Sequence, residues 1–382
     1  MKIIIILSVF LIIFCLAGYY VYARTMQAFS GTFVDSVTFL ILYIILLSSF
    51  FIGKLVEVFS IGFISNILVR IGSIGAGFFL YALLFVIFFD FICLINYIIP
   101  FYPTFVTADF QKTKLFIGII SVSVISVVLV TGYINTRNPK VKNLDIKLCN
   151  KQNSFKTLNV VAVSDIHLGT MVNESKTKRL IKKINQLDPD LVLIAGDIID
   201  DNLKVVKHYN LLNYFKDLNP KYGVYSCLGN HEYISRAYKE LEYFEKHGIR
   251  MLKDSTIKVD DKFYIIGRDD IEGNNINGKK RKSLDELTKD IDFNLPVFLL
   301  DHQPYKLEKT AEYAVDLQFS GHTHSGQIWP LNYITGLIFE EDWGYLKKKN
   351  THFYISSGYG TAVVPIKVGN NSEIVNIKIS NK

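Results

Sequence analysis

The chain has few cysteines and lacks the glycine-rich loops that commonly bind nucleotides. Its four cysteines are scattered over 382 residues, at positions 15, 93, 149 and 227, and no two have the spacing of a metal finger or suggest a disulfide framework. We interpret them as small buried apolar side chains. Neither Gly-x-Gly-x-x-Gly nor the complete loop Gly-x-x-x-x-Gly-Lys-Ser/Thr occurs, so the sequence offers neither of these phosphate-binding motifs.

The net positive charge is low in the part of the chain where a nucleic-acid-binding domain would need it. Residues 1–142 contain nine Lys/Arg and four Asp/Glu, a net charge of +5, which leaves only +2 of the total of +7 for the other 240 residues. A nucleic-acid binder concentrates basic residues on its soluble domain. We therefore expect no nucleic-acid binding.

Long apolar runs dominate the first part of the chain. Hydrophobic residues make up 50% of the sequence, and a helix needs about 20 apolar residues to cross a bilayer core. Four runs meet or approach that length and predict transmembrane helices, at Ile3–Tyr22, Val37–Phe51, Gly75–Tyr97 and Leu115–Ile134. The first run also resembles a signal peptide, but we favour an uncleaved anchor.

The short loops between these runs predict an orientation. With four spans, seven basic residues fall on one side and three on the other, and the basic side is usually cytoplasmic. This predicts a multi-pass membrane protein with its C-terminal domain on the cytoplasmic face. The segment Leu55–Val69 is apolar but interrupted by polar residues, and we interpret it as an amphipathic surface helix. A fifth span there would reverse the orientation.

Asp90 lies inside the third apolar run. A carboxylate within a membrane is costly, so it is a candidate functional group. The alternative is that the helix is placed so that Asp90 meets another helix or the membrane interface. We favour this alternative.

A polar segment with Pro139 ends the apolar part of the chain. We predict a membrane region at 1–135, a linker and leading strand at 136–156, and an α/β domain at 157–382. In that domain, short β-branched runs alternate with helical patterns such as Ser175–Leu187.

Five motifs in this domain combine carboxylate, imidazole and amide side chains. They are Asp165-Ile166-His167, Gly196-Asp197-Ile198-Ile199-Asp200, Gly229-Asn230-His231-Glu232, His302 and Gly321-His322-Thr323-His324. Each of them follows a predicted strand, and the carboxyl ends of strands in an open α/β sheet meet at one edge. Such oxygen and nitrogen donors suit Mn, Fe or Zn. The motifs therefore predict a metal-dependent enzyme.

These motifs resemble those of the calcineurin-like metallophosphoesterase superfamily, over about residues 155–382. Val163–Gly169 and Gly321–Gln327 are similar to its bacterial membrane-associated branch, which includes YkuE-like and transmembrane metallophosphoesterases. The resemblance implies two mixed β-sheets packed as a sandwich and flanked by helices. It also implies a binuclear metal centre that hydrolyses phosphoesters.

The resemblance assigns a role to each motif residue. The first metal would be held by Asp165, His167, Asp197 and His324. The second would be held by Asp197, Asn230, His302 and His322, with Asp197 bridging. His231 would stabilise the phosphoryl oxygens or protonate the leaving oxygen, while Asp200 and Glu232 would orient ligand imidazoles by accepting their other N–H.

The favoured function is hydrolysis of a phosphodiester or pyrophosphate, with a lipid-linked substrate and contact with membrane lipids. Alternatives are a phosphoesterase for soluble nucleotides that uses the anchor for location only, and a membrane scaffold with a regulatory phosphoesterase domain. The oligomeric state is not indicated. Two basic runs, at 279–282 and 347–349, favour solvated loops over lipid contact.

Two further segments bear on the substrate. Ser356–Gly360 departs from the related membrane proteins, because Ser357 replaces a basic residue that could touch the substrate, and Lys367 stands where arginine is more usual. The apolar stretch Ile328–Phe339 follows the last ligands directly. It is either core or a lip that accepts acyl chains.

Overall fold

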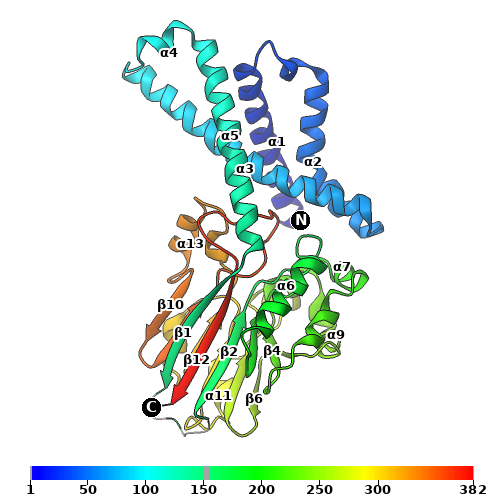
Figure 1. Ribbon diagram of the computed structural model, residues 1–382, viewed down its shortest axis with the longest axis vertical. Coiled ribbons are helices and arrows are strands. Elements are labelled where there is room, and N and C mark those ends of the chain that lie inside the picture. Colours follow the sequence, from blue (N-terminus) through cyan, green and yellow to red (C-terminus); the bar gives the residue numbers. More distant parts are fainter. Residues whose placement is uncertain (1, 149–150, 152–154, 382) are drawn as a thin grey trace. The chain divides into compact units, whose positions relative to one another are not determined.

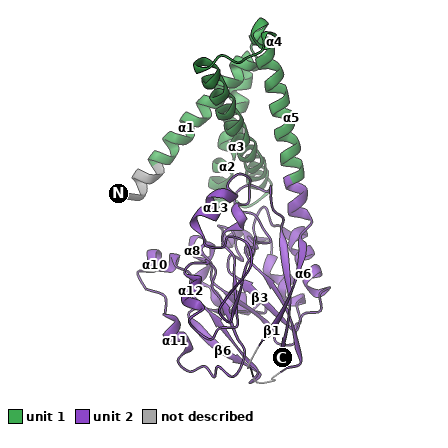
Figure 2. Ribbon diagram, turned by 90° about the vertical axis from the view of Figure 1, so that its left-hand side faces the viewer, with its two compact units in different colours: residues 1–131 green, residues 132–382 purple. Residues whose placement is uncertain are grey.

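A computed structural model describes residues 2–148, 151 and 155–381. Cys149 and part of the predicted linker lie outside these residues. The chain forms two compact units, residues 1–131 and 132–382 (Figure 2).

Unit 1 is built from long apolar helices (Figure 1). Four are long and apolar enough to cross a membrane, namely α1 (Lys2–Ala28), α2 (Val37–Phe59), α3 (Phe63–Ile98) and α5 (Phe110–Arg137). Short turns, η1 (Phe33–Asp35) and α4 (Thr104–Ala108), lie between them. Each helix contains one predicted span, and most are longer than the apolar run that predicted them.

The prediction of a separate surface helix at Leu55–Val69 is wrong. This segment is divided between the end of α2 and the start of α3. Ser60 and Gly62 adopt extended backbone, which breaks the helix. The polar residue Glu57 is buried and pairs with Lys54 at 3.2 Å, so it does not mark a water-facing side. Within the described residues, no fifth helix has the length and composition of a span.

Small residues bring α2 and α3 together. A Cβ atom at Gly72 would overlap the backbone of Phe50, and one at Gly53 would lie 2.7 Å from the Val69 nitrogen. In a membrane, helix association relies on such close packing, because lipid is as apolar as the side chains. The glycines therefore set how closely this helix pair packs.

Asp90 on α3 contacts α1, as the favoured interpretation expected. Its carboxylate lies 2.6 Å from Arg24 Nη2 and accepts a hydrogen bond from Arg24 Nε at 2.9 Å. The Tyr20 hydroxyl also donates to it. These contacts neutralise the charge and connect the two helices.

Unit 2 contains two six-stranded sheets. The first has the order β1-β12-β2-β3-β4-β5, formed by Lys140–Leu148, Glu373–Asn381, Thr157–Val163, Leu191–Ala195, Val224–Cys227 and Ile249–Leu252. The second has the order β10-β11-β9-β8-β7-β6, formed by Gly344–Lys348, Thr351–Ile355, Leu317–Ser320, Val297–Leu300, Phe263–Gly267 and Ser255–Val259. Both sheets are mixed, because β12 is antiparallel to β2 and β10 is antiparallel to β11.

The two sheets pack face to face around one apolar core. Buried side chains from both sheets meet there, among them Val160, Leu193, Phe263, Phe298 and Phe319. A second cluster joins the other face of the first sheet to α6 (Glu174–Asn185), and a third joins the outer face of the second sheet to α11 (Leu284–Thr288). The predicted sandwich flanked by helices is confirmed.

The strand order brings the five motifs together. β2, β3 and β4 are parallel neighbours, and so are β8 and β9. Each motif follows the carboxyl end of one of these strands. The motifs therefore lie at one edge of the sandwich.

The packing of α2 on α3 predicts the effect of a single methyl group. Gly72→Ala should lower the free energy of unfolding by about 1–3 kcal/mol, since the added atom overlaps Phe50. Gly62→Ala is the matched control, because nothing lies within 4 Å of its Cβ position. Thermal unfolding of both variants in detergent checks this. Equal shifts in Tm would contradict the packing argument.

Candidate metal centre

The backbone at the site is held in an uncommon conformation. Five of the seven predicted ligands have positive φ, namely Asp165 (48°), His167 (54°), Asp197 (51°), His322 (73°) and His324 (50°). Each such residue costs about 1–3 kcal/mol, and such residues cluster at functional sites. The surrounding fold therefore fixes these ligands in place.

The first group of predicted ligands is Asp165, His167 and His324, all of them buried. The Nε2 atoms of His167 and His324 lie 3.1 Å apart. His324 Nε2 is also 3.5 Å from Asp165 Oδ1. Three donor atoms of this chemistry thus point at a common position.

The second group centres on Asp197. Its Oδ2 lies 3.1 Å from His302 Nε2, and the Asn230 Oδ1 atom lies 3.1 Å from the same nitrogen. His322 Nδ1 is 2.9 Å from Asn230 Oδ1. The second predicted ligand set is therefore brought together, with Asn230 among its members.

These separations fit metal ions. Two ligands at about 2.1 Å from one ion lie roughly 3–3.5 Å apart in octahedral or tetrahedral geometry, which is the spacing seen in both groups. Asp197 Oδ2 also lies 3.9 Å from His167 Nε2, so this oxygen faces both groups. The residues present fit divalent metal ions held by oxygen and imidazole donors.

The electrostatics of the site favour a bound cation. Burial acts to raise the pKa of Asp197, but the charges of His302 and His231 outweigh it and hold the pKa well below its usual range. Burial, reinforced by the charge of His302, lowers the pKa of His322 to about 3. Burial and the charge of His167 hold the pKa of His324 well below its usual value. The site therefore combines an ionised Asp197 carboxylate with neutral imidazoles at His322 and His324. At His302, burial lowers the pKa but the charge of Asp197 outweighs it and raises the pKa well above its usual value, so a metal ion bound there would replace a proton.

Asp200 and His231 lie beside the first group. Asp200 Oδ1 is 3.3 Å from His167 Nδ1 and 3.7 Å from His231 Nδ1. His231 Nδ1 also lies 2.8 Å from the Asp200 carbonyl oxygen. The position of Asp200 suits the predicted orientation of His167, and the rings of His231 and His167 meet edge to face at 4.6 Å.

The hydrogen bonds of the Glu232 carboxylate within the described residues go to backbone N–H groups, and none goes to an imidazole, so its predicted role of orienting an imidazole has no contact behind it. Its buried carboxylate accepts the backbone N–H groups of Asp197 (2.9 Å), Ile199 (3.1 Å) and Gly229 (2.7 Å). The reason is local, because Glu232 occupies the third position of α8 (Asn230–Ile234) and turns back to cap the helix start. Burial and the charge of Asp197 raise its pKa to about 7. Glu232 therefore joins the β3 and β4 loops.

The salt bridges beside His302 could not be inferred from the sequence. The neighbouring Asp301 is buried and pairs with Arg268 at 2.9 Å and Arg281 at 2.8 Å. Arg281 belongs to the basic run at 279–282 that was interpreted as a solvated loop. Its side chain is instead largely covered and pairs with Asp301. Its pairing could not be inferred from spacing, because the loop that carries it returns to the sheet edge only through the tertiary fold.

Position 357, where related membrane proteins carry a basic residue, lies inside the fold. Ser357 is buried, and its hydroxyl donates to the Asn371 carbonyl oxygen at 2.8 Å. Lys367 supports this loop from inside, because its Nζ donates to the carbonyl oxygens of Ser357 and Gly358. Burial lowers the pKa of Lys367 to about 8. A Cβ at Gly358 would lie 2.8 Å from the Asp165 Cβ, so the loop packs against a ligand.

An α/β sandwich with clustered carboxylate and imidazole side chains at its strand ends defines a metal-dependent hydrolase. Residues 158–326 match the family described as calcineurin-like phosphoesterase. A metallophosphoesterase of Campylobacter jejuni is 33% identical over 267 residues, covering 69% of this chain and 70% of that protein. One from Aquifex aeolicus is 30% identical over 227 residues, covering 59% and 86%.

A transmembrane protein with a metallophosphoesterase domain from Danio rerio is 30% identical over 275 residues, covering 68% of this chain and 62% of that protein. The chain belongs to the calcineurin-like metallophosphoesterases. It is a metal-dependent phosphoester hydrolase, and its apolar helices and transmembrane relatives locate it at a membrane.

The contacts of Glu232 predict a large loss of stability without it. Glu232→Ala leaves three buried N–H groups unpaired, each costing about 1–3 kcal/mol, so unfolding should become easier by at least about 3 kcal/mol. Glu242→Ala is the control, since that residue is exposed. Denaturant unfolding of the full chain in detergent measures the difference. A loss no larger than that of the control would show that these N–H groups find other partners.

Proposed function

We propose that the protein hydrolyses a phosphodiester or a pyrophosphate at a centre of two divalent metal ions. One ion would be held by Asp165, His167, Asp197 and His324. The other would be held by Asp197, Asn230, His302 and His322. The observation that carries the proposal is the position of Asp197 between the two groups.

The hydrogen bonding of Asp197 supports a bridging role. Its Oδ1 accepts the His231 backbone N–H at 2.9 Å, which fixes the carboxylate plane. Oδ2 then faces His302 at 3.1 Å and His167 at 3.9 Å. A carboxylate oxygen has enough lone pairs to bind two cations, whereas the unprotonated nitrogen of an imidazole has one lone pair and binds one cation. Two bound metals, whether Mn, Fe or Zn, would supply a water of lowered pKa as nucleophile and neutralise the phosphoryl oxygens.

The neighbouring residues would orient the ligands and move a proton. Asp200 would accept the N–H of His167, leaving Nε2 free for the metal. His231 would donate its Nδ1–H to the Asp200 carbonyl oxygen, which leaves its other nitrogen for the substrate. That nitrogen would stabilise the phosphoryl oxygens or protonate the leaving oxygen.

The loop beside Asp165 favours a substrate of low charge. Ser356–Gly360 contains no arginine or lysine, so the loop offers no positive side chain to a phosphoryl group. A monoester dianion would need more such compensation than a diester, which carries a single negative charge. This supports the diester over the monoester.

The membrane location favours a lipid-linked substrate over a soluble nucleotide, because the anchor concentrates the enzyme at lipid. We propose a multi-pass arrangement with unit 2 on the cytoplasmic face, supported by the four apolar helices and the loop charges. Asp90 gives little support to a scaffold function, since its contacts with Arg24 and Tyr20 account for it structurally. A growth defect with Asp90→Asn but not with Asp197→Asn would favour the scaffold.

The bridging carboxylate can be tested by metal removal. The full chain, stripped of metal, should regain hydrolysis of bis-p-nitrophenyl phosphate when Mn is added, and should prefer it to p-nitrophenyl phosphate. Asp197→Asn should lose at least about a hundredfold in kcat/KM and hold fewer metal ions per chain. Asp188→Asn, at an exposed position that also has positive φ, is the matched control. Full activity in Asp197→Asn would refute the two-metal centre.

The role of His231 separates chemistry from metal binding. His231→Gln should lower kcat about 10²–10⁴-fold, as expected for loss of a general acid or a stabilising donor. Its metal content, measured by elemental analysis, should match the unaltered protein, because His231 is outside both ligand sets. Loss of metal together with activity would make His231 a ligand instead.

A further inference from the structure

An exposed apolar surface follows the last metal ligands. It consists of residues on and beside α13 (Asn332–Ile338), and we call it the apolar lip. Its large side chains are between 49% and 88% exposed in the full chain, and they are Trp329, Tyr333, Ile334, Leu337, Ile338 and Val363. Clustered exposed apolar side chains mark a partner or a membrane.

The apolar lip is tied by hydrogen bonds to the end of α5. The Trp329 backbone N–H donates to the Val368 carbonyl oxygen at 2.9 Å, and the Val368 backbone N–H donates to the Gln327 carbonyl oxygen at 2.9 Å. The backbone N–H of the neighbouring Lys367 donates to the Gly132 carbonyl oxygen at 3.0 Å, and Asn135 Nδ2 donates to the Lys367 carbonyl oxygen at 3.0 Å. Gly132 and Asn135 belong to the last turns of a helix long and apolar enough to cross a membrane.

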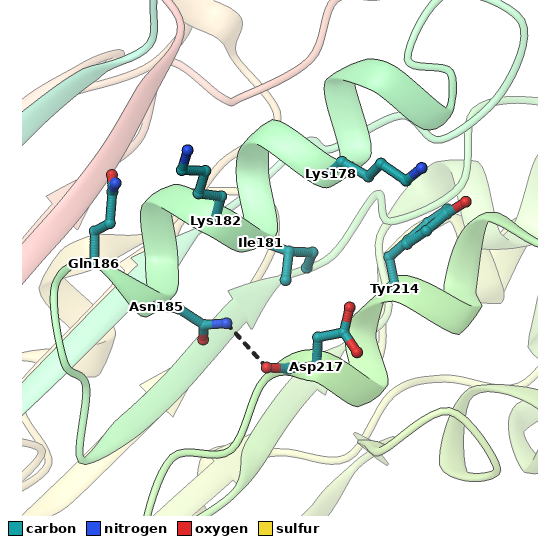
Figure 3. Close-up of a pocket in the computed structure, with 7 residues that line it drawn as sticks. All are labelled: Lys178, Ile181, Lys182, Asn185, Gln186, Tyr214 and Asp217. Atoms are coloured by element: carbon teal, nitrogen blue, oxygen red, sulfur yellow. Dashed lines mark hydrogen bonds between the residues drawn. The ribbon is translucent and has the colours of Figure 1, made fainter.

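Basic residues lie at the same end of α5. A hollow of about 470 Å³ is lined by Arg137, Asn138, Lys178, Arg179, Lys182, Lys183 and Gln186, five basic residues and no acidic one. Arg179 and Lys183 donate to the carbonyl oxygens of Arg137 and Pro139, at 2.7 and 3.1 Å, which fixes α6 beside this helix end. Figure 3 shows Lys178 and Lys182 on the same helix, α6, and Lys178 also pairs with Glu174 at 2.6 Å.

These features together match the interface of an anionic bilayer. Basic residues near such a surface gain about 1 kcal/mol each from the headgroups, and apolar side chains enter the layer beneath. A soluble protein partner would explain the apolar lip but not its attachment to a membrane-spanning helix. This combination favours a bilayer as the occupant of the surface, because α5 is long and apolar enough to cross one.

The apolar lip is also joined to the metal centre. The Phe339 ring lies 6.0 Å from the His322 ring and 5.0 Å from the Tyr305 ring. Asn370 Nδ2 donates to the His324 carbonyl oxygen at 2.6 Å. Gly326, with φ of 69°, has no room for a side chain against the Asn332 backbone. The ligand loop and α13 are thus packed as one piece.

We propose that the apolar lip inserts into the bilayer interface while the basic face of α6 contacts anionic headgroups. The metal centre then opens at the level of the headgroups and takes its phosphoester from a lipid of that bilayer. The insertion stands on its own, whereas the lipid substrate rests on the proposed hydrolase function.

Tryptophan fluorescence tests the insertion without any assay of activity. The chain has two tryptophans, so Trp343→Phe leaves Trp329 as the only emitter and Trp329→Phe leaves Trp343. The full chain is placed in nanodiscs of phosphatidylglycerol with or without bromine on the acyl chains. Trp329 should lose most of its emission with the brominated lipid, and Trp343 much less. Equal quenching of the two, or none at Trp329, would overturn the insertion.

A pair of chromogenic diesters tests the lipid substrate. Hexadecyl and ethyl p-nitrophenyl phosphate share the scissile bond, but only the first partitions into the bilayer. The protein should prefer the hexadecyl ester, and Leu337→Glu should reduce that preference about tenfold while leaving the ethyl ester unaffected. Leu337 is 88% exposed, so this change removes little packing. Ile276→Glu, at another exposed apolar position, should leave the preference intact.

The outcomes separate the two proposals. Inactivity on both esters with metal present would reject the proposed hydrolysis of diesters, while the fluorescence would still decide the insertion. Equal activity on both esters, unchanged by Leu337→Glu, would reject the lipid substrate and keep the hydrolase.

Discussion

The site depends on how the Asp197 carboxylate is held. One oxygen accepts the His231 N–H and the other faces both groups of ligands, while the Asp197 backbone N–H donates to Glu232. Two loops from different strands are thereby fixed to one residue. Because β3 lies between β2 and β4, Asp197 stands at the middle of the sheet edge. The predicted ligands that follow β2 and β4 lie on either side of it.

The sequence predicted which side chains would come together at the site, for a physical reason. Each ligand follows a short apolar strand, and parallel strands must end at one edge, so residues far apart in the chain could be expected to meet. Glu232 was misinterpreted because the same carboxylate suits an imidazole or a helix start, and only the fold shows which donors are near. For Leu55–Val69, the polar residues suggested a water-facing side, although Glu57 is paired and buried.

The environment of the apolar stretch Ile328–Phe339 could not be predicted from the sequence. A run of apolar residues has the same composition whether it enters a protein core or a bilayer interface. The tertiary contacts decide, and here the attachment of the Gln327–Trp329 loop to Lys367 and Val368 leaves α13 outside the core. Position 357 is similar, because its burial follows from the Lys367 side chain beneath the loop.

The order of strands also has a consequence for synthesis. β12 pairs with β1 along its whole length and with β2 on its other side, yet it is translated some 225 residues after β1 ends, counted from Leu148 to Glu373. Contacts so distant in sequence form late. While the ribosome makes the intervening chain, β1 lacks its partner strand and β2 has an open edge on the side that β12 will occupy. Unpaired strand edges can associate with other chains. We therefore expect a chaperone to cover these edges until β12 has been made.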